Sequence, residues 1–377
     1  MYIPILKTRQ SELKAVEHLD NVIKDNICPL FELTRSRKSK SSPDGDIEKR
    51  MEDITEKYGS DRPFILDITT IEYLSNNQIE ELQDSANDYG NWISFVAKQK
   101  KHFPKLIPTV ISNDSDALSD EDNQQRFLNQ IKALSDDFDL FAYRYPADYG
   151  SSLCAADFEL FQDNGINLNK IIFIIDHGFF QQVNISDNNR ILESRKKCTF
   201  DIIYNDNIKQ YRFHDIFVSA ESFPSNPAEA SDNINISSRD YHDGKIPIGA
   251  YELYKRINNN NIKYSDYATV FPEPTLQEGG RGWIPRIDLP TETDIIFGRE
   301  RRKPNENYPR PYREIAENII QTDNFKFISE KYPCWGIDNI KESAIDPTGL
   351  SPSHWIAVRV NIHMTIRCMM NFPNETP

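Results

Sequence analysis

The 377-residue sequence predicts an α/β fold: a TIM-barrel-like (β/α)8 barrel with a C-terminal β-meander and helical appendage. Three observations support this prediction. About eight short apolar runs recur along residues 1–271, and segments with helical periodicity separate them. Most of the runs are continuously apolar, which is typical of strands covered on both faces in a parallel sheet. The main alternative, a doubly wound open sheet, usually carries a glycine-rich phosphate loop after its first strand, and none is present here.

Strands and helices are expected to alternate regularly through residue 165. The predicted strands are YIPILK (2–7), CPLFEL (28–33), RPFILD (62–67), KLIPTV (105–110) and DLFAYR (139–144). The helices predicted between and after them cover 8–20, 46–59, 75–99, 119–137 and 152–164. Leu13, Val16 and Leu19 recur at helical spacing in the first helix, and Gly59 and Gly165 are stop signals for later ones.

The second half of the barrel is predicted from a sixth, a seventh and an eighth run. These are KIIFII (170–175), DIFVSAES (215–222) and YATVF (267–271). Between them we expect a helix at 186–197, a β-hairpin at 199–213 that turns at 205–207, and a helix at 244–259. The barrel domain would then cover 1–271 and the appendage 272–377, with a meander at 273–304 and helices at 312–325 and 351–372.

The composition argues against nucleic-acid-binding, membrane-spanning and disulfide-rich classes of protein. The net charge of −14 repels nucleic acid overall, so we expect no nucleic-acid partner. No apolar stretch approaches the length of a membrane span, and the chain starts without a signal peptide, so a cytoplasmic location is predicted. Five scattered cysteines indicate reduced thiols and not a disulfide framework.

The apolar runs end in charged residues, which predicts a site. In a barrel, the carboxyl ends of the strands form the active face. Five charged residues would lie there: Lys7, Glu32, Asp67, Arg144 and Asp176. Glu32, Asp67 and Asp176 would act as catalytic bases or metal ligands, and Lys7 and Arg144 would bind an anion. The alternative is a polar layer of paired charges that plugs the top of the barrel, because unpaired buried charges are costly.

Three further residues are predicted to bind the ligand. Ser222 ends the seventh run, Arg286 lies between Pro285 and Ile287, and Trp283 lies among arginines. Guanidinium groups suit phosphates and carboxylates, and an indole ring can stack on a base or a sugar. No HxH or HExxH spacing occurs, so no metal site is predicted, and no cofactor is identified.

Several phrases resemble a known family when they are taken in order. They are YIPILKTRQSELKAVEHL, PLFEL, PFILDI, SAESFP, CWGIDNI and HWIAVRVNIHMT, and they span nearly the whole chain. Together they resemble the phage beta protein family, named for a phage T4 protein. That family often shows two adjacent histidines in its closing motif, where this chain has Asn361, Ile362 and His363. The resemblance implies a setting among phages, mobile elements and bacterial defence loci, and no particular reaction.

Two functions are therefore expected. The first is a phage- or defence-associated barrel protein that binds or processes a small anionic ligand, phosphorylated or nucleotide-like, at the carboxyl-end face. The second is a non-catalytic interaction component of a phage or antiphage defence system, with a protein partner from the same locus. The sequence does not choose between an enzyme and a binding protein, since barrels host many functions.

Overall fold

The computed structural model describes residues 1–40, 42–112, 121–180, 185–225, 241–273, 283–303 and 305–371. Eight strands form one parallel sheet in the order β4-β3-β2-β1-β9-β7-β6-β5. They are β1 (Ile3–Lys7), β2 (Leu30–Leu33), β3 (Phe64–Ile68), β4 (Leu106–Pro108), β5 (Phe141–Pro146), β6 (Ile171–Phe179), β7 (Asp215–Glu221) and β9 (Ile262–Asp266).

The two outer strands of this sheet meet and close the barrel. A parallel bridge joins Thr109, just after β4, to Ala142 on β5. The Val110 amide also donates to the Ala142 carbonyl over 2.9 Å. The sheet is thus a nearly closed eight-stranded barrel, which confirms the predicted fold class.

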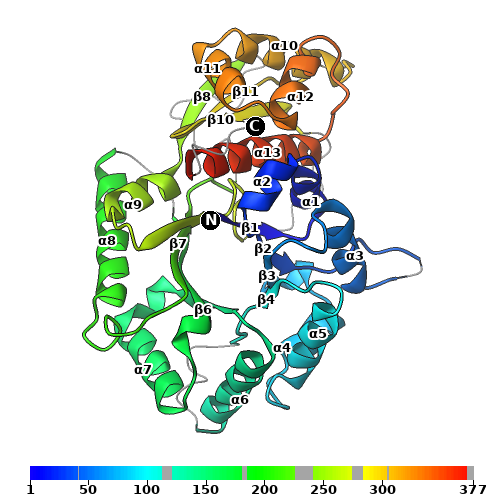
Figure 1. Ribbon diagram of the computed structural model, residues 1–377. Helices are drawn as coiled ribbons and strands as arrows, with labels where there is room; N and C mark the ends of the chain where they lie inside the picture. The colour runs from blue at the N-terminus through cyan, green and yellow to red at the C-terminus, as the bar shows by residue number, and fades with distance from the viewer. Residues whose placement is uncertain are drawn as a thin grey trace.

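Helices surround the barrel on the outside (Figure 1). They are α1 (Gln10–Glu17), α2 (Asn21–Asn26), α3 (Glu48–Lys57), α4 (Asn77–Gln83), α5 (Gly90–Lys100), α6 (Glu121–Asp137), α7 (Gly150–Asp163), α8 (Ile185–Ile203) and α9 (Gly249–Ile257). Their apolar faces pack on the outward-facing side chains of the strands in one large core. This two-layer burial explains why most of the strands are continuously apolar.

A separate apolar plug fills the barrel interior. It contains Ile5, Leu30, Ile65, Ala142 and Ile174, together with neighbouring side chains of the same face. Successive side chains of a strand point to opposite faces, so the residue two positions further along points inward as well. This periodicity carries five polar side chains to the top of the plug. They are Lys7, Glu32, Asp67, Arg144 and Asp176, each two residues after a plug residue.

The last helix, α13 (Pro352–Asn371), completes the barrel. It packs on α1 and α2, at the seam between the first and last strands (Figure 1). Nearly all of its side chains from Trp355 to Cys368 are buried, because the barrel covers one side and the cap described next covers the other.

A small second unit, here called the cap, lies beyond α13 (Figure 1). Its antiparallel sheet has the order β10-β11-β8, with β8 (His242–Pro247), β10 (Arg286–Pro290) and β11 (Asp294–Arg299). The helices α10 (Pro309–Ile320), α11 (Asp323–Lys331) and α12 (Trp335–Ser343) cover it. The cap is built from two stretches, one after β7 and one after β9. The boundary near residue 271 stays a prediction, although β8 lies before it and pairs with β11.

Four predicted elements were wrong. The helix at 312–325 is interrupted, because α10 ends at Ile320 and α11 begins at Asp323. The hairpin at 199–213 is absent, because residues 199–203 continue α8, with Ile202 fully buried against the barrel. The eighth strand is Ile262–Asp266, and residues 267–271 form a turn after it. The helix at 244–259 begins only at Gly249, because 242–247 belong to β8. The predicted meander is partly confirmed by β10 and β11, and its residues 274–282 lie outside the described ranges.

No helix within the described ranges combines the length and the apolar character that crossing a membrane requires.

Candidate functional site at the barrel mouth

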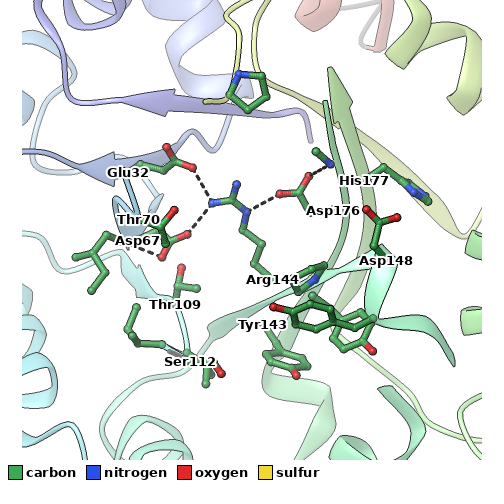
Figure 2. Close-up of a pocket in the computed structure, with 18 of the residues that line it drawn as sticks. Glu32, Asp67, Thr70, Thr109, Ser112, Tyr143, Arg144, Asp148, Asp176 and His177 are labelled. Carbon is green, nitrogen blue, oxygen red and sulfur yellow. Dashed lines mark hydrogen bonds and ion pairs between the residues drawn. The ribbon is translucent and has the colours of Figure 1, made fainter. Parts of the chain in front are cut away.

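Five charged residues meet at the carboxyl-end face of the barrel, and we call them the mouth cluster. They are Lys7, Glu32, Asp67, Arg144 and Asp176. The strand register places the first three in one layer, since Lys7 lies opposite Glu32 and Glu32 lies opposite Asp67. Arg144 extends across the barrel axis to reach all three carboxylates (Figure 2). The strand ends identified in the sequence therefore form a single cluster.

The guanidinium of Arg144 is the centre of this cluster. Its Nη1 donates to Glu32 over 2.8 Å and to Asp67 over 2.9 Å, and its Nε donates to Asp176 over 2.8 Å. Its Nη2 donates to the Tyr267 hydroxyl over 2.7 Å, and that hydroxyl donates to Asp176 over 2.6 Å. Three carboxylates thus share one arginine. These residues therefore do not form separate one-to-one ion pairs.

Lys7 supplies the second positive charge. Its Nζ lies 2.6 Å from Glu32 Oε2 and 5.9 Å from the centre of the Tyr267 ring. Burial opposes the ionisation of Glu32, but the charges and hydrogen bonds of Lys7 and Arg144 outweigh it and lower the pKa of Glu32 to about 2. Glu32 is therefore a fixed negative charge at neutral pH.

Asp67 behaves in the opposite way. Burial raises the pKa of its carboxyl, and this effect, with the nearby charge of Glu32, exceeds the stabilisation from Arg144. Two carboxyls that share one guanidinium nitrogen thus have pKa values displaced in opposite directions. Such a pair is the usual basis for separate acid and base roles.

The mouth cluster forms the floor of a cavity of about 750 Å³. This volume suits a small organic ligand. Its wall contains Tyr143, Tyr145, Tyr149, Leu153 and Phe179 as well as the acidic residues Asp148 and Asp157. The Tyr143 hydroxyl donates to Asp157 over 2.5 Å, and burial nevertheless raises the pKa of Asp157 to about 6.

Several of these wall residues were missed from the sequence. Tyr267 was assigned to a predicted strand that is absent. Recognising β9 would have placed Tyr267 directly after its last residue, Asp266, at the barrel mouth. Tyr143 and Asp157 give no sequence signal, because each looks like an ordinary residue of a strand or a helix. His177 also lines the cavity; burial lowers its pKa to about 3, so its ring is neutral.

The other three predicted ligand residues do not line the cavity. Arg286, on β10, donates from Nε to Asp288 over 2.7 Å and stacks on the Phe297 ring. The Ser222 hydroxyl accepts from the Gly249 amide over 2.8 Å. Trp283 stacks on Tyr308 on the cap surface. Their role in ligand binding stays a prediction, and the structure does not bring them to the mouth cluster.

No group of three or more His, Cys, Asp or Glu side chains is arranged to hold a metal ion in the part of the chain that the structure describes. The carboxylates of the mouth cluster point at Arg144, so the guanidinium occupies the position where they converge.

A second polar cluster lies beneath α13, and we call it the sealed cluster. Asp266, at the end of β9, accepts from Tyr2 over 2.6 Å, from Tyr264 over 2.5 Å and from the Ala268 amide over 2.9 Å. His363 Nε2 lies 2.6 Å from the second Asp266 oxygen. All four side chains are at most 2% exposed. Burial opposes the ionisation of Asp266, but the bonds from His363, Tyr2 and Tyr264 outweigh it and lower its pKa.

Comparison with known proteins identifies relatives along the whole chain. The family model described as "Beta protein" matches residues 2–367. "Protein beta" of Enterobacteria phage P4 is 28% identical over 382 residues, covering 96% of this chain and 91% of that protein. Among solved structures, a match to the Bacillus cereus spore cortex-lytic enzyme SleL covers 96% of this chain and 73% of that chain, with 12% identity and a TM-score of 0.34.

Proposed function

This chain belongs to the beta protein family, and we propose that it binds a small ligand in the barrel mouth and carries out acid–base chemistry on it. The observation that supports the proposal is the convergence of three carboxylates on Arg144, with Lys7 beside Glu32, at the floor of a cavity large enough for a ligand. The setting implied by the family and by the phage P4 relative is a phage or a mobile element.

The roles are assigned from the opposite pKa shifts of Glu32 and Asp67. Asp67, whose pKa is raised by burial, is the group that exchanges a proton with the ligand. Glu32, whose pKa is lowered to about 2, stays charged and holds Lys7 and Arg144 in place. Asp176 fixes the other edge of Arg144, because its second oxygen is anchored by the Gly178 amide over 2.9 Å.

The anionic, phosphorylated or nucleotide-like ligand expected from the sequence remains part of this proposal to be tested. Both cations of the mouth already bind carboxylates, so an anion would compete with Glu32, Asp67 and Asp176 for them. A role in defence, and a protein partner from the same locus, are proposals that rest on the family setting.

The non-catalytic alternative receives no specific support from the surface. A protein-interaction surface would be indicated by a large exposed apolar patch. Apart from Tyr149 and Leu153 at the start of α7, the large apolar side chains that are exposed within the described ranges lie on separate elements, for example Phe327 on α11 and Ile345 after α12. The mouth cluster also differs from a set of simple ion pairs, because three carboxylates share one arginine.

A thermal-shift screen tests the proposal. The purified protein would be combined with amines, sugars, nucleotides and sugar phosphates, beside an Asp67→Asn variant that keeps the shape of the side chain. The proposal expects at least one class to raise the melting temperature of the wild type and to do so less in the variant. If no class has any effect on the wild type, the mouth is not a small-ligand site, and pull-down of a protein partner becomes the next step.

A further inference from the structure

We propose that the ligand of the barrel mouth is an organic cation, with an ammonium group beside an apolar part. This inference rests on the proposed function, since it names the class of ligand that the mouth would take. It comes from the balance of charge in the cavity, from the bonding of its two cations and from the composition of its rim.

The charged residues that line the cavity are mostly acidic. Within the described ranges they are Lys7 and Arg144 on the positive side and Glu32, Asp67, Asp148, Asp157, Asp176 and Glu273 on the negative side. Asp67 and Asp157 have raised pKa values. Even if both are protonated, four carboxylates face the two lining cations, and Arg195 on α8 adds only one further positive charge near Asp148 and Asp176. A cavity with this excess attracts cations and repels anions.

The two cations already pair with carboxylates. Arg144 donates from Nε, Nη1 and Nη2 to protein groups, and Lys7 binds Glu32 over 2.6 Å. An incoming anion would therefore compete with these carboxylates for both cations, and leaving a buried carboxylate unpaired is costly.

Asp148 is the acidic group best placed to meet a ligand. It lines the cavity, is exposed, and makes no hydrogen bond or salt bridge within the described ranges, although the charge of Arg195 on α8 acts on it from nearby. It lies in the short 3-10 turn Ala147–Tyr149, at the start of α7. A cation that enters the cavity would give this carboxylate a direct partner.

An apolar rim lies next to Asp148. Tyr149 and Leu153 are 43% and 45% exposed although both line the cavity, and the Tyr145 ring meets the Tyr149 ring edge-on at 6.0 Å. Aromatic faces attract ammonium groups, and apolar side chains bury the rest of such a ligand. Carboxylate and aromatic rim together fit a cation that carries an apolar part.

The test uses probes that differ only in charge: benzylamine, benzyl alcohol and benzoate. Ligand-observed NMR titration of the full chain would measure their affinities, which are expected in the millimolar range for molecules of this size. We expect benzylamine to bind about tenfold more tightly than benzyl alcohol, and benzoate to bind least.

Two variants locate the effect. Asp148→Asn should weaken benzylamine binding about fivefold while leaving benzyl alcohol unchanged. Asp163→Asn, an exposed residue at the other end of α7, is the matched control and should change nothing.

The outcomes separate this inference from the proposed function. If benzoate or a phosphate binds most tightly and the Asp67→Asn variant weakens that binding, the mouth is a ligand site and the cation inference is wrong. If the three probes bind equally, or if Asp148→Asn has no effect on benzylamine, the inference is also wrong. If neither these probes nor the wider screen gives binding, both proposals fail.

Discussion

The mouth cluster and the sealed cluster both begin with an aspartate at the carboxyl end of a barrel strand, yet they lie in opposite environments. Asp176 follows Ile174 of the interior plug and points into the barrel, where a cavity opens above it. Asp266 follows Ile262 and Tyr264 of the outer core and points outward, where α13 covers it. The face of the strand decides which aspartate can meet a ligand.

Similar polar groups have different roles in the two clusters. In the sealed cluster one carboxylate accepts four hydrogen bonds, and the cluster joins β9 to α13 and to the first strand. In the mouth cluster three carboxylates share two cations, and the side chains line a cavity. The sealed cluster links the last helix to the barrel, whereas under the proposed function the mouth cluster meets a ligand.

The largest effect on stability is expected at Asp266. An Asp266→Ala variant leaves Tyr2, Tyr264 and His363 without their common acceptor in a buried position, so the free energy of unfolding should fall by about 4 kcal/mol. Denaturant titration would measure it. An Asp176→Ala variant is the comparison and should lose clearly less, because Arg144 keeps Glu32 and Asp67. Equal losses would remove the distinction between the clusters.

The next effect concerns Glu221, which lies beside the sealed cluster. Burial, with the nearby charge of Asp266, raises its pKa from 4.5 to about 8. A raised pKa in the folded state contributes stability that is full below pH 4.5 and is lost as the pH rises through 8. The Glu221→Gln variant lacks this loss. Its stability relative to the wild type should therefore rise by about 4 kcal/mol between pH 5 and pH 9.

Denaturant titrations of both proteins at the two pH values would measure this difference. Groups that titrate equally in the two proteins cancel in the comparison. A stability difference that does not change with pH would mean that Glu221 stays ionised in the folded protein.

Glu32 gives a smaller effect with the opposite sign. Its pKa falls from 4.5 to about 2 in the folded protein, so its contribution is full above pH 4.5 and is lost as the pH falls through 2. The advantage of the wild type over Glu32→Gln should therefore shrink by about 2 kcal/mol between pH 6 and pH 3. A constant difference over that range would show that Lys7 and Arg144 do not hold Glu32 in its charged form.

The smallest stability effect is expected at Asp148. This exposed residue makes no hydrogen bond or salt bridge within the described ranges, and its interaction with Arg195 is solvent-screened, so Asp148→Asn should change the free energy of unfolding by less than about 0.5 kcal/mol. The same variant should weaken benzylamine binding. A large loss of stability would mean that Asp148 supports the fold, and the binding result could then not be assigned to the ligand.

The mouth cluster was predictable from the sequence because each of its residues is marked by the apolar run directly before it. An apolar run that ends in a charged residue marks a strand leaving the core, and parallel strands of a barrel end on the same face. The sealed cluster was not predictable, because β9 reads as a polar segment. Its Lys263 lies 2.6 Å from Asp215 of β7, a partner far away in sequence. The apolar residues 267–271 were chosen as a strand in its place.

The third strand of the cap sheet, β8, escaped prediction for the same reason. Strand β8 finds its partner β11 across more than one intervening element, and no local pattern encodes that pairing. At the end of α8, a segment with strand-like composition continues a helix. Its Thr199 hydroxyl bonds back to the Arg195 carbonyl over 3.0 Å, and Ile202 packs into the outer core. Tertiary packing overrode local propensity there.

The central claim is that the mouth cluster serves a ligand and not the fold. The most direct test replaces all of its charges with neutral residues of similar shape: Lys7→Met, Glu32→Gln, Asp67→Asn, Arg144→Met and Asp176→Asn. Its measured free energy of unfolding at neutral pH should lie within about 1 kcal/mol of the wild type, because whole buried ion networks can be replaced at little cost. A loss of about 4 kcal/mol or more, or failure to fold, would show that the cluster is a structural plug of the barrel.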